Sequence, residues 1–111
     1  MRATALALLL ACAPRGRGAP CDSGAPVSWE GFGQGFFTTY CRSCHSSGLS
    51  ERYGAPEGVN LDTEAEVLAQ EARIRARVLT DGDMPPGGGV LPGDLDLLER
   101  YLDCATADQG G

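Results

Sequence analysis

Lysine is absent from this chain of 111 residues: all nine basic residues are arginine, and there is a single histidine, His45. Arginine does not deprotonate in proteins, so it is a poor metal ligand. A single histidine excludes any site that needs two imidazoles. Aromatic residues are also scarce, at 6%, and a chain this short buries only a modest core of its own. We therefore expect an additional element to stabilise the fold.

The chain also lacks an apolar run long enough to span a membrane. Arg2 is followed by an apolar stretch over residues 3–11, well short of the roughly 20 residues that a transmembrane helix needs. A basic start and a short apolar segment are typical of a secretory signal. The stretch ends in Leu9-Leu10-Ala11-Cys12, which resembles a bacterial lipobox.

We therefore expect residues 1–11 to be a signal segment and Cys12 to be the lipidated first residue of the mature protein. This interpretation places the protein in the periplasm or on the outer side of a bacterial membrane, attached through lipid. The alternative is a plain signal followed by a soluble mature protein.

Positive charge is sparse in the part of the chain after this leader. From Cys21 onward there are six arginines and fifteen aspartates and glutamates, which give a formal net charge of −9. Such a balance argues against binding to nucleic acid and against electrostatic adhesion to anionic lipid. It favours a partner protein with a basic docking patch, although ordinary solubility explains the same balance equally well.

The rest of the sequence divides into a tether, one domain and a tail. Residues 12–27 are rich in Ala, Pro, Gly and Arg without apolar periodicity, which indicates a flexible tether. Helical periodicity occupies residues 28–104, and no alternating pattern is long enough to indicate a sheet. We predict one all-α domain over residues 28–104 and a flexible tail over residues 105–111.

Three helical segments are predicted within this domain. Ser28 is suited to cap the first, in which the aromatic residues recur at helical spacing. Thr63 and Glu66 have the spacing of a capping box that opens the second. Asp94 is expected to cap the last helix, with Pro92 and Gly93 separating that helix from the preceding loop.

The most specific motif is Cys41-Arg42-Ser43-Cys44-His45. A Cys-x-x-Cys-His run is typical of covalent haem c attachment. Two thiols separated by two residues can reach the two vinyl groups of one porphyrin, and the imidazole that follows can reach the iron. We predict that His45 is an axial ligand of one haem.

The second axial ligand follows by elimination. With no other histidine and no lysine, and with Met1 in the signal segment, the remaining soft donor is Met84, 39 residues after His45. A thioether ligand favours Fe(II) and raises the reduction potential. Pro85 and Pro86 restrict the backbone of the segment that carries Met84.

Two other interpretations of the cysteines exist. A Cys-x-x-Cys pair can be a thioredoxin-like redox motif, but no βαβ pattern surrounds it here. A four-thiolate zinc site made by Cys21, Cys41, Cys44 and Cys104 is a further possibility. Neither interpretation gives His45 or the Met-Pro-Pro segment a role.

With these motifs in place, the chain resembles the class I cytochromes c over about residues 28–104. The family has a glycine and an aromatic residue eight and four positions before the first haem cysteine, here Gly33 and Phe37. Its last helix carries an aliphatic and an aromatic residue that cross this pair, here Leu98 and Tyr101. The resemblance implies a cytochrome c fold, in which three to four helices surround one haem and the N- and C-terminal helices cross.

The resemblance also implies roles for further residues. A proline after the histidine offers its carbonyl oxygen to the imidazole N–H in this family, and Pro56 is placed for that role. Arg52 and Tyr53 are candidates to bind a haem propionate, with a solvated turn as the alternative. Cys21 and Cys104 flank the two helices that should cross, so they are expected to form a disulfide bond.

The function expected from the sequence is electron transfer rather than catalysis: a monohaem c-type cytochrome that carries single electrons between redox partner proteins outside the cytoplasm. The alternative is a haem enzyme or a small-ligand sensor in which Met84 dissociates from the iron. The lysine ring of mitochondrial-type cytochromes is missing, so their mode of partner docking cannot be transferred.

Overall fold

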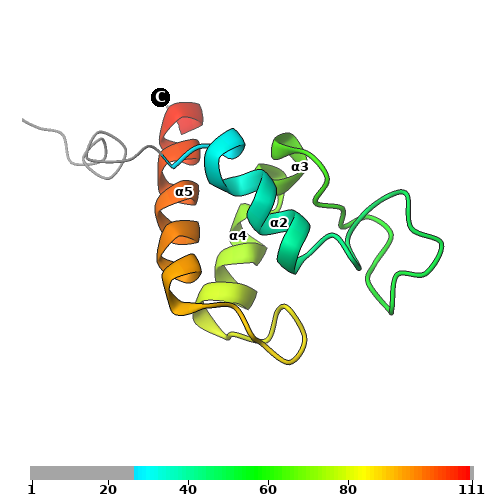
Figure 1. Cartoon of the computed structure of the whole chain (residues 1–111). Helices are drawn as coiled ribbons and strands as arrows, with labels where there is room; N and C mark the ends of the chain where they lie inside the picture. The colour runs from blue at the N-terminus through cyan, green and yellow to red at the C-terminus, as the bar shows by residue number, and fades with distance from the viewer. Residues whose placement is uncertain (1–26, 111) are drawn as a thin grey trace, which may run out of the picture.

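A computed structural model describes residues 27–110 of the chain. Helices and loops make up this part, and no strand occurs within it, which confirms the predicted all-α class. The elements in chain order are the π-helical η3 (Trp29–Gly33), α2 (Gln34–Tyr40), α3 (Glu64–Ala69), α4 (Glu71–Ile74), the π-helical η4 (Arg75–Thr80) and α5 (Pro92–Gly110). They form three helical stretches separated by two loops (Figure 1).

Two of the predicted helix caps are confirmed. The Ser28 hydroxyl accepts a hydrogen bond from the backbone N–H of Gly31 at 2.9 Å, ahead of η3. The Thr63 hydroxyl accepts from the N–H of Glu66 at 3.2 Å, and the Glu66 carboxylate accepts from the N–H of Thr63 at 3.1 Å. All three bonds satisfy donors that the start of a helix leaves unpaired.

The predicted start of the last helix was wrong. α5 begins at Pro92, so Pro92 and Gly93 belong to the helix and Asp94 lies in its first turn. A proline suits the first helical position because its fixed φ is helical and its missing N–H would have had no partner there. The Asp94 carboxylate instead accepts a hydrogen bond from the Tyr40 hydroxyl at 2.8 Å, which raises the pKa of Tyr40.

The predicted domain boundary after residue 104 does not coincide with a break in the structure. α5 continues to Gly110, and Ala105 still packs against the core. The Thr106 hydroxyl donates to the carbonyl oxygen of Leu102 at 2.7 Å, so the helix is continuous through this region.

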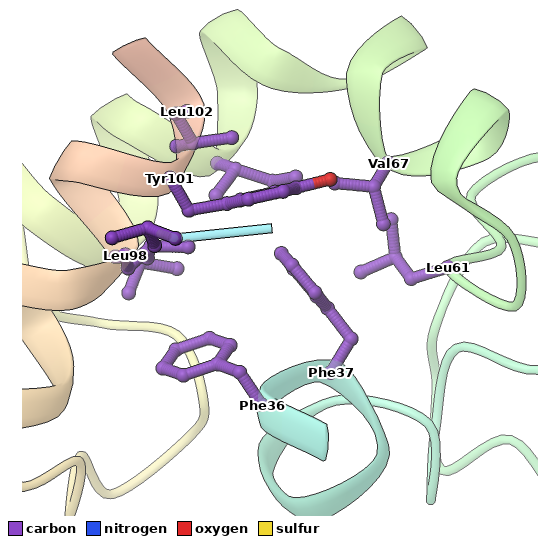
Figure 2. Close-up of a cluster of buried hydrophobic side chains, with 10 residues drawn as sticks. Phe36, Phe37, Leu61, Val67, Leu98, Tyr101 and Leu102 are labelled. Atoms are coloured by element: carbon purple, nitrogen blue, oxygen red, sulfur yellow. The ribbon is translucent and has the colours of Figure 1, made fainter. Parts of the chain in front are cut away.

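The hydrophobic core lies where η3 and α2 meet α5. Phe37, Leu98 and Tyr101 are almost fully buried, and Figure 2 shows them gathered in one cluster with Phe36 beside Phe37. Gly33 is buried at this contact. A Cβ atom at Gly33 would lie 2.7 Å from the Trp29 ring and 3.2 Å from the Tyr101 ring. The close approach of glycine and aromatic residue that the sequence predicts is therefore present.

α5 is also joined by polar contacts to the other helical stretches. Tyr40, at the end of α2, reaches Asp94 as described. The Tyr101 hydroxyl donates to the Glu64 carboxylate of α3 at 2.7 Å, and burial together with this carboxylate raises the pKa of Tyr101. Arg75 of η4 donates to Asp103 at 2.9 Å. The last helix is thus hydrogen-bonded to both earlier helical stretches.

Cys104, in α5, is disulfide-bonded. Its expected partner, Cys21, lies outside the described residues, as do Cys12 and the segments 1–11 and 12–26. The Cys21–Cys104 pairing and the lipidation of Cys12 therefore stay predictions. Within residues 27–110, no helix combines the length and the apolar character needed to cross a bilayer.

Candidate functional site

A cavity of about 780 Å³ lies between the end of α2, the loop that follows it, α4 with η4, and the segment before α5. This volume falls in the range of roughly 300–1,000 Å³ that ligand and cofactor sites occupy. Cys41, Cys44, His45 and Met84 all line it. The structure thus brings together the four residues that the sequence predicts as haem-binding, although Met84 comes from a distant part of the chain.

The walls of the cavity are largely apolar. Among the lining residues are Phe37, Leu61, Ile74, Val78, Pro85 and Pro86. Phe37, Leu61, Ile74 and Val78 also belong to the buried core, so one hydrophobic cluster supports the fold and forms the site. Arg73, Arg77, Gln70 and Tyr53 supply polar groups to the lining.

The cysteine motif begins where α2 ends. The N–H of Cys41 donates to the carbonyl oxygen of Phe37 at 3.0 Å, and the N–H groups of Cys44 and His45 both donate to the carbonyl oxygen of Cys41, at 3.1 and 2.9 Å. One compact turn therefore holds the three functional side chains. Both cysteines are free thiols. Burial, assisted by the nearby Cys44, raises the pKa of the Cys41 thiol to about 12, which keeps this thiol neutral at physiological pH.

The imidazole of His45 is oriented by the carbonyl oxygen of Val59, which lies 2.9 Å from Nδ1. A carbonyl oxygen can only accept, so Nδ1 carries the proton and Nε2 keeps a lone pair for a metal. The prediction that the Pro56 carbonyl oxygen accepts from the imidazole was wrong. That oxygen accepts from Arg52 at 2.7 Å instead, because the loop turns once more before its backbone reaches the imidazole at Val59.

The Arg52 side chain donates hydrogen bonds to backbone carbonyl oxygens, which leaves few donors for a propionate. Its guanidinium donates to the carbonyl oxygens of Ser46 at 2.7 Å, Pro56 at 2.7 Å and Val59 at 3.0 Å, with a longer contact of 3.4 Å to Ala55. These four bonds use most of the five N–H groups of the side chain. The prediction that Arg52 binds a propionate is therefore not supported by its contacts.

Tyr53, the other propionate candidate, is placed differently. It lines the cavity, yet 74% of its surface is exposed. Its backbone has φ of 55°, in the left-handed region that non-glycine residues seldom adopt. The side chain lies at the rim of the cavity, and its proposed contact with a propionate stays a prediction.

Asp62 fastens the cysteine motif to the segment before α3. Its carboxylate accepts from Arg42, between the two cysteines, at 2.9 Å and from the N–H of Ser47 at 2.9 Å. Hydrogen bonds from Ser46 and Ser47 and from Arg42 lower the pKa of Asp62 to about 2. This contact could not be predicted from the sequence, since Arg42 and Asp62 lie 20 residues apart with no periodic pattern between them.

We expect the Asp62 contacts to be lost in acid. The folded-state pKa is below the ordinary value of about 4, so the stabilisation is complete above about pH 4 and disappears as the pH falls through about 2. Solvent screening should limit the loss to about 1 kcal/mol. Urea denaturation of wild type and Asp62→Asn between about pH 5 and 2 measures it, because the difference between the two free energies of unfolding should shrink toward pH 2. A difference that stays constant over this interval would contradict the prediction.

The segment that carries Met84 is held by Arg77 of η4. The carbonyl oxygen of Arg77 accepts from the N–H groups of Asp83 and Met84 at 3.0 and 3.2 Å. Its guanidinium donates to both oxygens of the Asp83 carboxylate, at 2.9 and 3.0 Å. This contact lowers the pKa of Asp83 and raises that of Arg77. Sequence reasoning missed the pair, because the six-residue separation spans the end of a helix and matches no helical spacing.

The two other interpretations of the cysteines do not fit this arrangement. A four-thiolate zinc site would need Cys104 as a thiolate, but that residue is in a disulfide bond. A thioredoxin-like site would need a βαβ unit, and the described part of the chain is helical. No family model, curated protein or solved structure matches the chain.

Proposed function

We propose that this chain is a monohaem c-type cytochrome with the cytochrome c fold, carrying single electrons between redox partner proteins outside the cytoplasm. The observation that carries the proposal is the convergence of two free thiols, the only imidazole and a thioether on one apolar cavity. Soft sulfur and imidazole donors in an apolar pocket suit haem iron.

The residues of the cavity fit haem c one by one. Cys41 and Cys44 would hold the porphyrin through thioether bonds, and neutral thiols such as that of Cys41 can add to vinyl groups without a buried charge remaining. His45 and Met84 would supply the two axial ligands. When bound, the haem iron supplies the reversible change between Fe(III) and Fe(II).

The protein's own contribution is to hold these ligands still and to exclude water. Val59 fixes the proton on Nδ1 of His45, and Arg77 anchors the backbone of Met84 and the side chain of Asp83. The Phe37, Ile74 and Val78 side chains supply an apolar surface against the cavity. A site whose two ligands are both held by the fold needs little rearrangement during electron transfer, and this favours an electron carrier over an enzyme or sensor with a dissociable Met84.

Export, lipid attachment at Cys12 and partners with a basic docking patch complete the proposal. They rest on the sequence of residues 1–12 and on the acidic balance of the chain after Cys21. None of them is needed for the haem site itself.

The proposal is tested by expressing the protein together with a haem-attachment system. We expect the mass of one haem to stay on the polypeptide after denaturation, and the reduced protein to show the absorption bands of a six-coordinate c-type haem. Cys41→Ser and Cys44→Ser should each lose one thioether bond, whereas Ser43→Ala, within the same motif, should leave attachment intact. A colourless product would refute haem binding. Rapid stoichiometric binding of carbon monoxide by the wild type would instead favour the enzyme or sensor.

A further inference from the structure

One backbone oxygen is shared by His45 and Arg52. The carbonyl oxygen of Val59 lies 2.9 Å from Nδ1 of His45 and accepts from Nη2 of Arg52 at 3.0 Å. A carbonyl oxygen has two lone pairs, so both donors can be satisfied at once. The carbonyl oxygen that orients the imidazole therefore also accepts a hydrogen bond from a positively charged guanidinium.

The position of Arg52 is fixed by contacts that do not involve His45. Its guanidinium also bonds the carbonyl oxygens of Ser46 and Pro56, each at 2.7 Å. The guanidinium is planar and holds its donors in a rigid fork. Among residues 27–110 no carboxylate forms an ion pair with Arg52, so the charge is directed at carbonyl oxygens alone.

The chemical consequence concerns how strongly His45 donates electrons. An imidazole whose Nδ1–H is held by a strong acceptor gains basicity at Nε2 and stabilises an oxidised metal. A guanidinium on the same oxygen forms a charge-assisted bond and draws electron density from it, which makes that oxygen a weaker acceptor for His45. The shared carbonyl should therefore limit the electron donation from Nε2.

We propose that Arg52 tunes the axial imidazole as a positioning residue that acts through Val59: by sharing the carbonyl oxygen that accepts from Nδ1 of His45, it raises the reduction potential. This inference rests on the proposed function, because it presumes that Nε2 of His45 ligates haem iron. It gives Arg52 a role in place of the propionate contact expected from the sequence.

The experiment compares Arg52→Met with Arg73→Met in haem-loaded protein. Arg73 lines the same cavity and has no hydrogen bond or ion pair with other described residues, so its removal deletes the same charge without touching the Val59 carbonyl. We expect Arg52→Met to shift the equilibrium between the two oxidation states toward Fe(III) by about tenfold, which for one electron is about 59 mV. Arg73→Met should give a clearly smaller shift, and Arg52→Lys, which keeps the charge, an intermediate one.

A second measurement separates the hydrogen bond from general electrostatics and from folding. In the Met84→Ala background, the iron–imidazole stretching frequency of the reduced protein reports on the bond at Nδ1. It should rise when Arg52→Met is added and stay unchanged with Arg73→Met.

Equal potential shifts for the two arginine variants, or an unchanged or lowered stretching frequency with Arg52→Met, would overturn the inference while leaving haem binding intact. Arg52 would then serve only to fasten the loop. Wild-type protein that carries no haem, or whose haem is not ligated by His45, would overturn the proposed function and this inference with it.

Discussion

Replacing Met84 with alanine should open the iron to external ligands. The Met84→Ala variant is expected to bind carbon monoxide stoichiometrically in its reduced form, which the wild type should not do. It should also lose the weak near-infrared sulfur-to-iron band of the oxidised protein. The reason is that the described cavity lining contains no second methionine or histidine, and its other basic groups are arginines, which do not ligate metals.

The segment that carries Met84 should stay in place when its side chain is removed. Its backbone bonds to Arg77 and the Arg77–Asp83 pair do not involve the Met84 side chain, so the variant should lose the ligand without losing the loop. Leu91→Ala is the matched control, since Leu91 belongs to the same connection, is 63% exposed and does not line the cavity. Retention of the sulfur-to-iron band in Met84→Ala would show that Met84 is not the ligand.

A leucine at Gly33 should cause the largest loss of stability among substitutions in the first helical stretch. Even a Cβ atom there would lie 2.7 Å from the Trp29 ring and 3.2 Å from that of Tyr101, and the rest of the side chain would have to displace one or both rings. Trp29 packs on Phe37 and Tyr101, with ring centroids 6.2 and 6.4 Å away, so the displacement would spread through the contact with α5. Overpacking of this kind costs roughly 1–3 kcal/mol or more.

Two other glycines in the same stretch serve as controls. A Cβ atom at Gly35 meets nothing within 4 Å, and one at Gly31 meets only the Ser28 hydroxyl at 3.0 Å. Leucine at Gly35 should raise stability by up to roughly 1 kcal/mol through helix propensity, while at Gly31 part of this gain is offset by crowding of the cap. Denaturant midpoints of the three haem-loaded variants measure the difference. Equal midpoints for Gly33→Leu and Gly35→Leu would mean that the contact between η3 and α5 is misplaced.

The features that could be predicted from the sequence are those encoded locally. Ser28 and the Thr63–Glu66 box act within four residues of themselves, so their roles follow from spacing alone. The gathering of His45 and Met84 could be predicted because the chain offers so few alternative donors. With one histidine, no lysine and two methionines in the chain, the ligand pair could be predicted without knowing which distant residues come together in the fold.

The features that sequence reasoning missed depend on the path of the loop between α2 and α3. Whether Pro56 or Val59 reaches the imidazole is decided by the turns around Tyr53, whose φ is 55°, and no periodicity encodes such turns. The role of Arg52 follows from the same backbone path, since all its acceptors are carbonyl oxygens. Asp94 was misassigned because its partner, Tyr40, lies 54 residues away.

The three polar links of α5 have a consequence for the order in which the chain can fold. The hydrogen-bond partners of Tyr40, Glu64 and Arg75 all lie in the last helix, 54, 37 and 28 residues further along the chain. Closing such long loops costs entropy before any contact compensates for it. The earlier helices therefore cannot complete their packing without α5, and a chain cut before Pro92 would expose Phe36 and Phe37 to proteases.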